Sequence, residues 1–211
     1  MPSTIVHMAF AGLLAAALLG PAFDRRSLAV VLAVVAFPDL DSFVALIVTP
    51  GHRTVFHNVW IPVVAAAAIY ADTRVRERSI LRTRWGDRGV RVAWVAVACY
   101  LAAHLGLDLA DGVINLFWPV YDQFYALRGS IELSDQRGIV QTFVEFDGLV
   151  PSLQGFGTAE EVQITTGVDP GEDTSERLFP IVRAGWQLVI LVTGTLVVAA
   201  RLWSPGADAQ S

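Results

Sequence analysis

The sequence predicts an all-α integral membrane protein with about five transmembrane helices and a long acidic extracytoplasmic loop between the fourth and the fifth. Hydrophobic residues form 54% of the 211-residue chain and charged residues only 17%, whereas soluble domains carry roughly 25% charged residues. Five apolar stretches approach the roughly 20 residues that a helix needs to cross a bilayer. All 15 basic residues are arginines, and ten of them fall where they would share one side of a membrane.

The five predicted spans differ in how cleanly apolar they are. The first contains His7 as its ionisable group and lacks the positively charged start of a signal peptide, so we expect a retained helix. The second is interrupted at Pro38, because proline removes a backbone donor and loosens a helix. The third is short, and the fourth carries three ionisable residues. The spans cover residues 5–23, 27–49, 58–71, 92–119 and 178–203.

The arginines predict the orientation, because cytoplasmic loops of membrane proteins are enriched in basic residues. Arginines lie in the connection 24–26, in the segment 72–91, which has seven arginines against three acids, and at Arg201 after the last span. These places share one side if the chain crosses five times. We therefore expect a multi-pass protein of the cytoplasmic membrane, with its N-terminus outside and its C-terminus inside. The net charge of −5 argues against binding to nucleic acid.

Three regions follow from this arrangement. Residues 1–119 form a four-helix membrane core, and residues 178–211 form the fifth helix with a short cytoplasmic tail. The segment 120–177 between them carries eleven acids and three arginines. It is too long for an idle connection in a compact protein, so we expect an extracytoplasmic loop or a small cap.

The same topology brings the ionisable residues of the membrane core to one side. His104 and Asp108 are four residues apart and project from one face of a helix. A break at Pro38 would let Asp39 and Asp41 reach the same site. The residues expected on the outer side are His7, His52, His57 and His104 with Asp39, Asp41, Asp108 and Asp111.

This grouping predicts a metal site. An aspartate at membrane depth costs roughly 2.5–3.5 kcal/mol, and Arg53 alone cannot balance several carboxylates. Imidazole and carboxylate together suit zinc, manganese or iron. A catalytic zinc usually takes three protein ligands, so this larger set favours two divalent ions, zinc or manganese. The predicted ligands are His7, Asp39, Asp41, His52, His57, His104 and Asp108.

Two further residues are candidates for the chemistry rather than for the metal. Arg53 could clamp a phosphate or be a solvated charge, and Asp111 could support the ligands or cap the end of its helix. The other elements also have structural alternatives when they are taken singly. The two aspartates at the break could cap it or carry protons, and His104 with Asp108 could join two helices by a hydrogen bond.

The order of these motifs resembles the YdjM-like family of small membrane proteins, described as membrane-bound metal-dependent hydrolases, some under LexA control. The matching elements are His7, Pro-Asp-Leu-Asp (38–41), Gly-His-Arg-Thr-x-x-His (51–57) and His-x-x-x-Asp (104–108), followed by Gly112-Val113 and Leu116-Phe117-Trp118-Pro119. They lie within residues 1–119. Asn58 stands where the family usually has Ser or Thr, which should leave ligation intact. The family is distantly similar to zinc-dependent phospholipase C and related nucleases, which implies phosphoester hydrolysis.

The expected function is therefore a metal-dependent hydrolase acting on a phospholipid or a lipid-linked phosphate at the outer face of the membrane. The expected partners are the lipid bilayer and that substrate. One alternative is a metal or proton transporter that uses the same residues as a relay, although no inverted repeat is visible. Another is a metal-stabilised scaffold without activity.

Overall fold

The computed structural model describes residues 2–47, 52–147, 150–162, 164–168 and 177–203. Gly51, the first residue of the motif 51–57, lies outside these residues. So does the tail predicted after the last span, residues 204–211. The chain forms two compact units. We call Pro2–Pro38, Val59–His104 and Pro180–Ser211 the helical unit, and Asp39–Asn58 with Leu105–Phe179 the loop unit.

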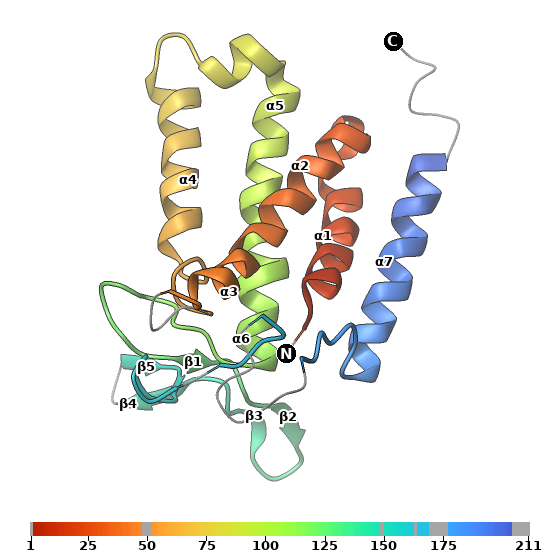
Figure 1. Ribbon diagram of the computed structural model, residues 1–211. Coiled ribbons are helices and arrows are strands. Elements are labelled where there is room, and N and C mark those ends of the chain that lie inside the picture. The colour runs from red at the N-terminus through yellow and green to blue at the C-terminus, as the bar shows by residue number, and fades with distance from the viewer. Residues whose placement is uncertain (1, 48–51, 148–149, 163, 169–176, 204–211) are drawn as a thin grey trace. The chain divides into compact units, whose positions relative to one another are not determined.

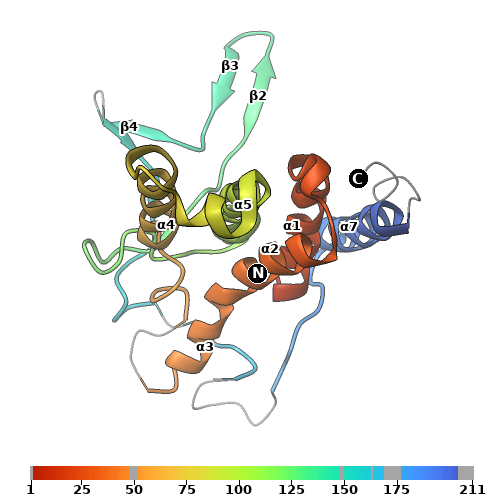
Figure 2. The same ribbon diagram turned by 90° about the horizontal axis from the view of Figure 1, so that it is seen from above.

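Five helices make up the helical unit, and polar residues mark where several of them begin. Ser3 caps the first helix through the amide of Val6, and Asp24 caps the second through that of Ser27 at 2.8 Å. The helices are α1 (Thr4–Leu18), α2 (Arg25–Ala36), α4 (Trp60–Tyr70), α5 (Ile80–Cys99, kinked at Gly86) and α7 (Gly185–Trp203). In Figure 1, α1, α4, α7 and the part of α5 after its kink run nearly upright, and α2 is inclined across them, as the view from above confirms (Figure 2).

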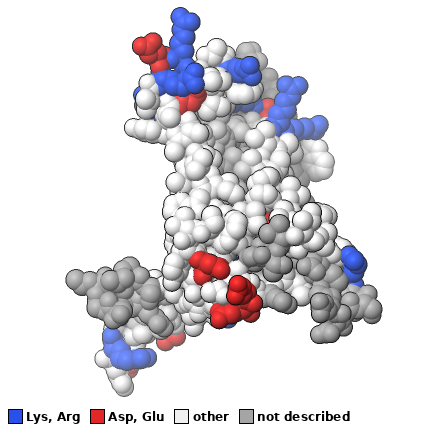
Figure 3. Space-filling model, turned by 60° about the vertical axis from the view of Figure 1, so that its left-hand side comes forward, with Lys and Arg blue, Asp and Glu red and all other residues white. Residues whose placement is uncertain are grey.

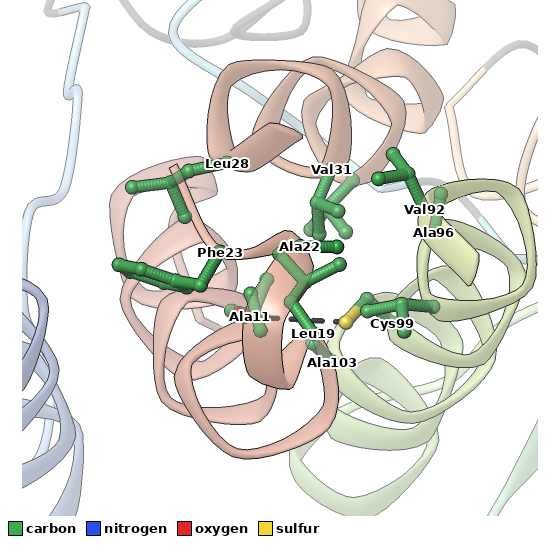
Figure 4. Packing of buried hydrophobic residues seen from close by; sticks show 13 residues of the cluster. Ala11, Leu19, Ala22, Phe23, Leu28, Val31, Val92, Ala96, Cys99 and Ala103 are labelled. Carbon is green, nitrogen blue, oxygen red and sulfur yellow. Dashed lines mark hydrogen bonds between the residues drawn. The ribbon is translucent and has the colours of Figure 1, made fainter. Parts of the chain in front are cut away.

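The core of the helical unit lies where α1, α2 and α5 meet (Figure 4). Many of its residues are small, which lets the helix backbones approach closely and gain van der Waals contact. Cys99 is fully buried there, with its Sγ 3.9 Å from the carbonyl oxygen of Ala11. Helix α7 packs on α1, and a Cβ added at Gly194 of α7 would collide with the backbone oxygen of Ala9.

Three helical stretches are long and apolar enough to cross a membrane: Arg25–Val44, Ile80–Asp111 and Gly185–Trp203. Helix α1, with 15 residues, and α4, with 11, are shorter. Large apolar side chains such as Val64 and Leu196 remain exposed on the helices, as lipid-facing residues do. The chain is thus a mostly helical membrane protein, and the count of five crossings stays a prediction.

The expected break in the second span is present. Helix α2 ends at Ala36, a 3₁₀ turn covers Phe37–Leu40, and the short helix α3 covers Asp41–Val44. Further along the chain, a π-helix spans Tyr100–Gly106, and α6 spans Leu107–Asp111.

The acidic segment contains short strands, so the chain is mostly helical rather than all-α. Three antiparallel pairs form among the described residues of this segment. The pairs are β1 (Tyr125–Ala126) with β6 (Gln154–Gly155), β2 (Ile131–Ser134) with β3 (Gly138–Gln141), and β4 (Glu145–Asp147) with β5 (Val150–Ser152). Strand β3 begins directly after the turn 135–137 with Gly138, whose φ of 69° favours glycine.

Candidate metal centre

The structure sorts the predicted ligands into two groups, one in each unit. Five of them belong to the loop unit: Asp39, Asp41, His52, His57 and Asp108. His7 and His104 belong to the helical unit.

Asp41 connects the two histidines of the loop unit. Its Oδ1 lies 2.7 Å from Nδ1 of His52, and its Oδ2 lies 2.7 Å from Nδ1 of His57. Asp41 and His57 are fully buried, whereas His52 keeps 9% of its side chain exposed. A carboxylate that accepts from Nδ1 orients an imidazole and presents its Nε2 to a ligand.

The opposite edge of the His57 ring faces two further carboxylates. Its Nε2 lies 3.3 Å from Oδ2 of Asp108 and 3.7 Å from Oδ1 of Asp39. The 3₁₀ turn at Phe37–Leu40 allows this, because Asp39 and Asp41 reach opposite edges of one imidazole across a break in the helix. The side chain of Asp39 is 23% exposed and gives this cluster an edge open to solvent.

Arg53 lies inside the cluster and is only 1% exposed, which excludes a solvated surface charge. Its guanidinium donates to Oδ1 of Asp108 and, at 2.9 Å, to the carbonyl oxygen of Val113. Its own carbonyl oxygen accepts from the amide of Asn115 at 3.0 Å. The backbone of Arg53 has a φ of 62°, in the left-handed region that non-glycine residues seldom adopt. Arg53 therefore joins the histidine motif to the chain after α6.

The electrostatics of the cluster favour a cation. Three carboxylates, those of Asp39, Asp41 and Asp108, surround His57, and Arg53 pairs with one of them, Asp108. Burial alone would lower the pKa of His57, but the hydrogen bonds to the three carboxylates raise it well above its usual value.

The donor set fits a divalent ion. Ligand atoms of Asp41, His52 and His57 lie within 4.8 Å of one another, and imidazole with carboxylate is a common set for zinc and manganese. The three carboxylates around His57 supply negative charge that such an ion would neutralise.

His7 and His104 form a separate pair within the helical unit. Their rings stack with centroids 4.2 Å apart, and both side chains are buried. Nδ1 of His7 lies 2.7 Å from the carbonyl oxygen of Ala103. The structure thus brings together two histidines that are far apart in the sequence. That they bind the same ions as the loop unit stays a prediction.

The remaining motif residues have defined places. Asp111 is the last residue of α6 and is half-buried, and its role stays a prediction. Asn58 donates at 2.8 Å to the carbonyl oxygen of Val55, so it supports the local backbone.

One residue of the site was missed by the reasoning from the sequence. Asn115 is fully buried, and besides its backbone bond to Arg53 it contacts Asp122 at 2.5 Å and the amide of Gln123 at 3.2 Å. The signal in the sequence was its position between Gly112 and Pro119, a stretch that resembles the YdjM-like family.

A family model described as the YdjM inner membrane protein matches residues 1–205 of this chain. The match extends well past the motifs of residues 1–119 and includes the acidic segment and α7. No curated protein and no solved structure matches the chain.

Proposed function

This chain belongs to the YdjM inner membrane protein family, and from that premise we propose that it is a membrane-embedded, metal-dependent hydrolase of a phosphoester. The observation that carries the proposal is the position of His57, held at Nδ1 by Asp41 and facing Asp39 and Asp108 with Nε2. This buried group of acidic and imidazole ligands has one partly exposed edge, as a site that admits a substrate requires.

The residues of the loop unit would have different roles in metal binding. An ion at the Nε2 edge of His57 would be bound by His57, Asp39 and Asp108, with Asp41 orienting the imidazole. Asp41 and His52 would be further ligands, because their ligand atoms and one of His57 lie within 4.8 Å of one another. A bound zinc or manganese ion supplies Lewis-acid activation of water and of the phosphoryl group. The size of the full predicted ligand set favours two ions.

Arg53 would position the carboxylate of Asp108. Because its guanidinium is buried and engaged with Asp108 and Val113, it holds the Asp108 carboxylate in one orientation toward His57. A charge-assisted bond of this kind keeps a ligand in place before the ion binds.

The proposed substrate is a phospholipid or a lipid-linked phosphate. Asp39 lies near the end of the candidate span Arg25–Val44 that is farther along the chain from Arg25 and Arg26. With the arginines in the cytoplasm, the five-span, N-out and C-in topology puts this cluster near the outer headgroups.

Elemental analysis and turnover of the detergent-purified protein test the proposal together. The probes are bis-p-nitrophenyl phosphate and phosphatidylglycerol micelles, with zinc and manganese added separately. We expect bound metal and turnover in the wild type, and loss of both in His57→Ala and Asp39→Asn. Asp135→Asn, at an exposed position between β2 and β3, is the matched control and should keep both.

Two outcomes would overturn the hydrolase. Full metal content in His57→Ala would show that this cluster does not bind the metal. Bound metal without turnover of either probe, combined with ion flux in liposomes, would support the transporter that the sequence leaves as the alternative.

A further inference from the structure

Three arginines from two helices converge on the turn 19–23 between α1 and α2, within the helical unit. Arg88 and Arg91 lie on α5, and Arg201 lies near the end of α7. Their guanidinium groups donate to backbone carbonyl oxygens of this turn: Arg91 to Leu19 (3.3 Å), Arg88 to Ala22 (3.4 Å) and Arg201 to Gly20 (3.5 Å).

The turn is shaped to receive these side chains. Gly20 has a φ of 54°, and a Cβ there would lie 2.9 Å from Nη1 of Arg91. The guanidinium of Arg201 lies over the ring of Phe23, 5.2 Å from its centroid. The charged groups are thus held at one place by backbone and ring contacts, yet Arg91 and Arg201 remain exposed.

The surroundings are strongly positive. Helix α2 begins with the exposed Arg25 and Arg26, and among the described residues of this turn and its contacts the one carboxylate is that of Asp24, which pairs with Arg88. Figure 3 shows basic side chains, with acidic ones among them, at the end of the helical unit where α4 joins α5, beyond a broad uncharged band. Each guanidinium has five N–H donors, so the bonds to the turn leave donors for an anion.

We propose that Arg88, Arg91 and Arg201 form a binding site for the phosphate of an anionic phospholipid headgroup. Exposed apolar side chains lie close by in sequence: Leu18 ends α1 just before the turn, and Trp203 follows Arg201 at the end of α7. A headgroup with attached acyl chains satisfies both the guanidinium groups and these apolar residues, whereas a free phosphate ion satisfies only the former. The proposed topology puts this site at the cytoplasmic leaflet, where anionic lipids attract basic residues.

The test compares two double variants that lose the same charge. Arg91→Gln/Arg201→Gln removes two arginines of the site, and Arg78→Gln/Arg84→Gln removes two exposed arginines on the connection to α5 and in α5. Binding of phosphatidylglycerol to the full-length protein in detergent is measured by native mass spectrometry, with phosphatidylcholine for comparison. At about fivefold for each arginine, we expect the first variant to bind phosphatidylglycerol roughly 30-fold more weakly and the second to bind nearly as the wild type.

Thermal unfolding gives a second readout. Phosphatidylglycerol should raise the Tm of the wild type and of the control variant, but not that of the Arg91→Gln/Arg201→Gln variant. Equal loss in both variants would mean a general surface charge and would overturn the site. An equal rise in Tm with inorganic phosphate would show a site for free anions and would overturn the assignment to lipid.

Discussion

Arg53 and Asp108 stand 55 residues apart in the sequence and form a buried ion pair in which both side chains are at most 2% exposed. The pair places one oxygen of Asp108 on the guanidinium and leaves the other 3.3 Å from Nε2 of His57. The histidine motif and the chain around α6 are therefore joined through the cluster itself.

Removing Arg53 should destabilise the protein, because it leaves an uncompensated buried carboxylate. We expect Arg53→Met to lower the free energy of unfolding by about 3–5 kcal/mol, measured by denaturant titration in detergent. The exposed Arg84→Met should change it by less than about 0.5 kcal/mol. A double variant with Asp108→Asn should lose less than the sum of the single losses, and full additivity would refute the pairing.

The pH dependence of metal binding should follow His57. Its carboxylate partners raise its pKa above the usual value of 6.5 despite burial, and an ion must displace the proton. Zinc affinity, measured by competition with a chelating dye, should therefore rise as the pH increases from 6.5 through the raised pKa. Below this range a proton occupies the imidazole and binding weakens.

The metal-free protein should show the opposite trend. A raised pKa in the folded state stabilises the fold below the unfolded value near 6.5, and this contribution is lost as the pH rises through the folded pKa. The Tm without metal should thus fall with rising pH in this window, while the stabilisation by added zinc grows. His57→Gln should remove both trends, and their persistence would assign them to another group.

The histidine pair of the helical unit is predicted to bind metal. We expect His104→Ala to lower the metal content by about one equivalent, as elemental analysis would measure. Cys99→Ala, which changes another buried residue of the same unit, should retain the wild-type content. Unchanged content in His104→Ala would restrict the ligands to the loop unit.

The contact of α7 with α1 should depend on Gly194. A leucine there would push against the backbone at Ala9, and overpacking of this kind costs about 1–3 kcal/mol. We expect Gly194→Leu to lower the Tm of the detergent-purified protein. Gly185→Leu is the control, because an added Cβ there meets no atom within 4 Å. Equal shifts in the two variants would argue against the close packing.

Much of the architecture was predictable because it depends on local pattern. Apolar length identified the regions of the five long helices, although the fourth begins at Ile80 rather than at residue 92 and helical structure there ends at Asp111 rather than at residue 119. Pro38 identified the break that became a 3₁₀ turn. The strands of the acidic segment were harder to predict, because pairs of two to four residues depend on the partner that each strand meets. The burial of Arg53 could not be predicted from the sequence, since an arginine in a histidine-rich turn is equally compatible with a solvated side chain.

By itself the sequence determined that this is a membrane protein, which family it resembles, and which side chains could bind a metal. Composition and spacing carry that information, because lipid selects apolar length and ligation selects residue type. Only the tertiary structure decided that Asp41 lies between His52 and His57, and that Arg53 pairs with Asp108 rather than facing solvent. Those contacts depend on the path of the backbone after the break, including the left-handed turn at Arg53, and no periodicity in the sequence encodes that path.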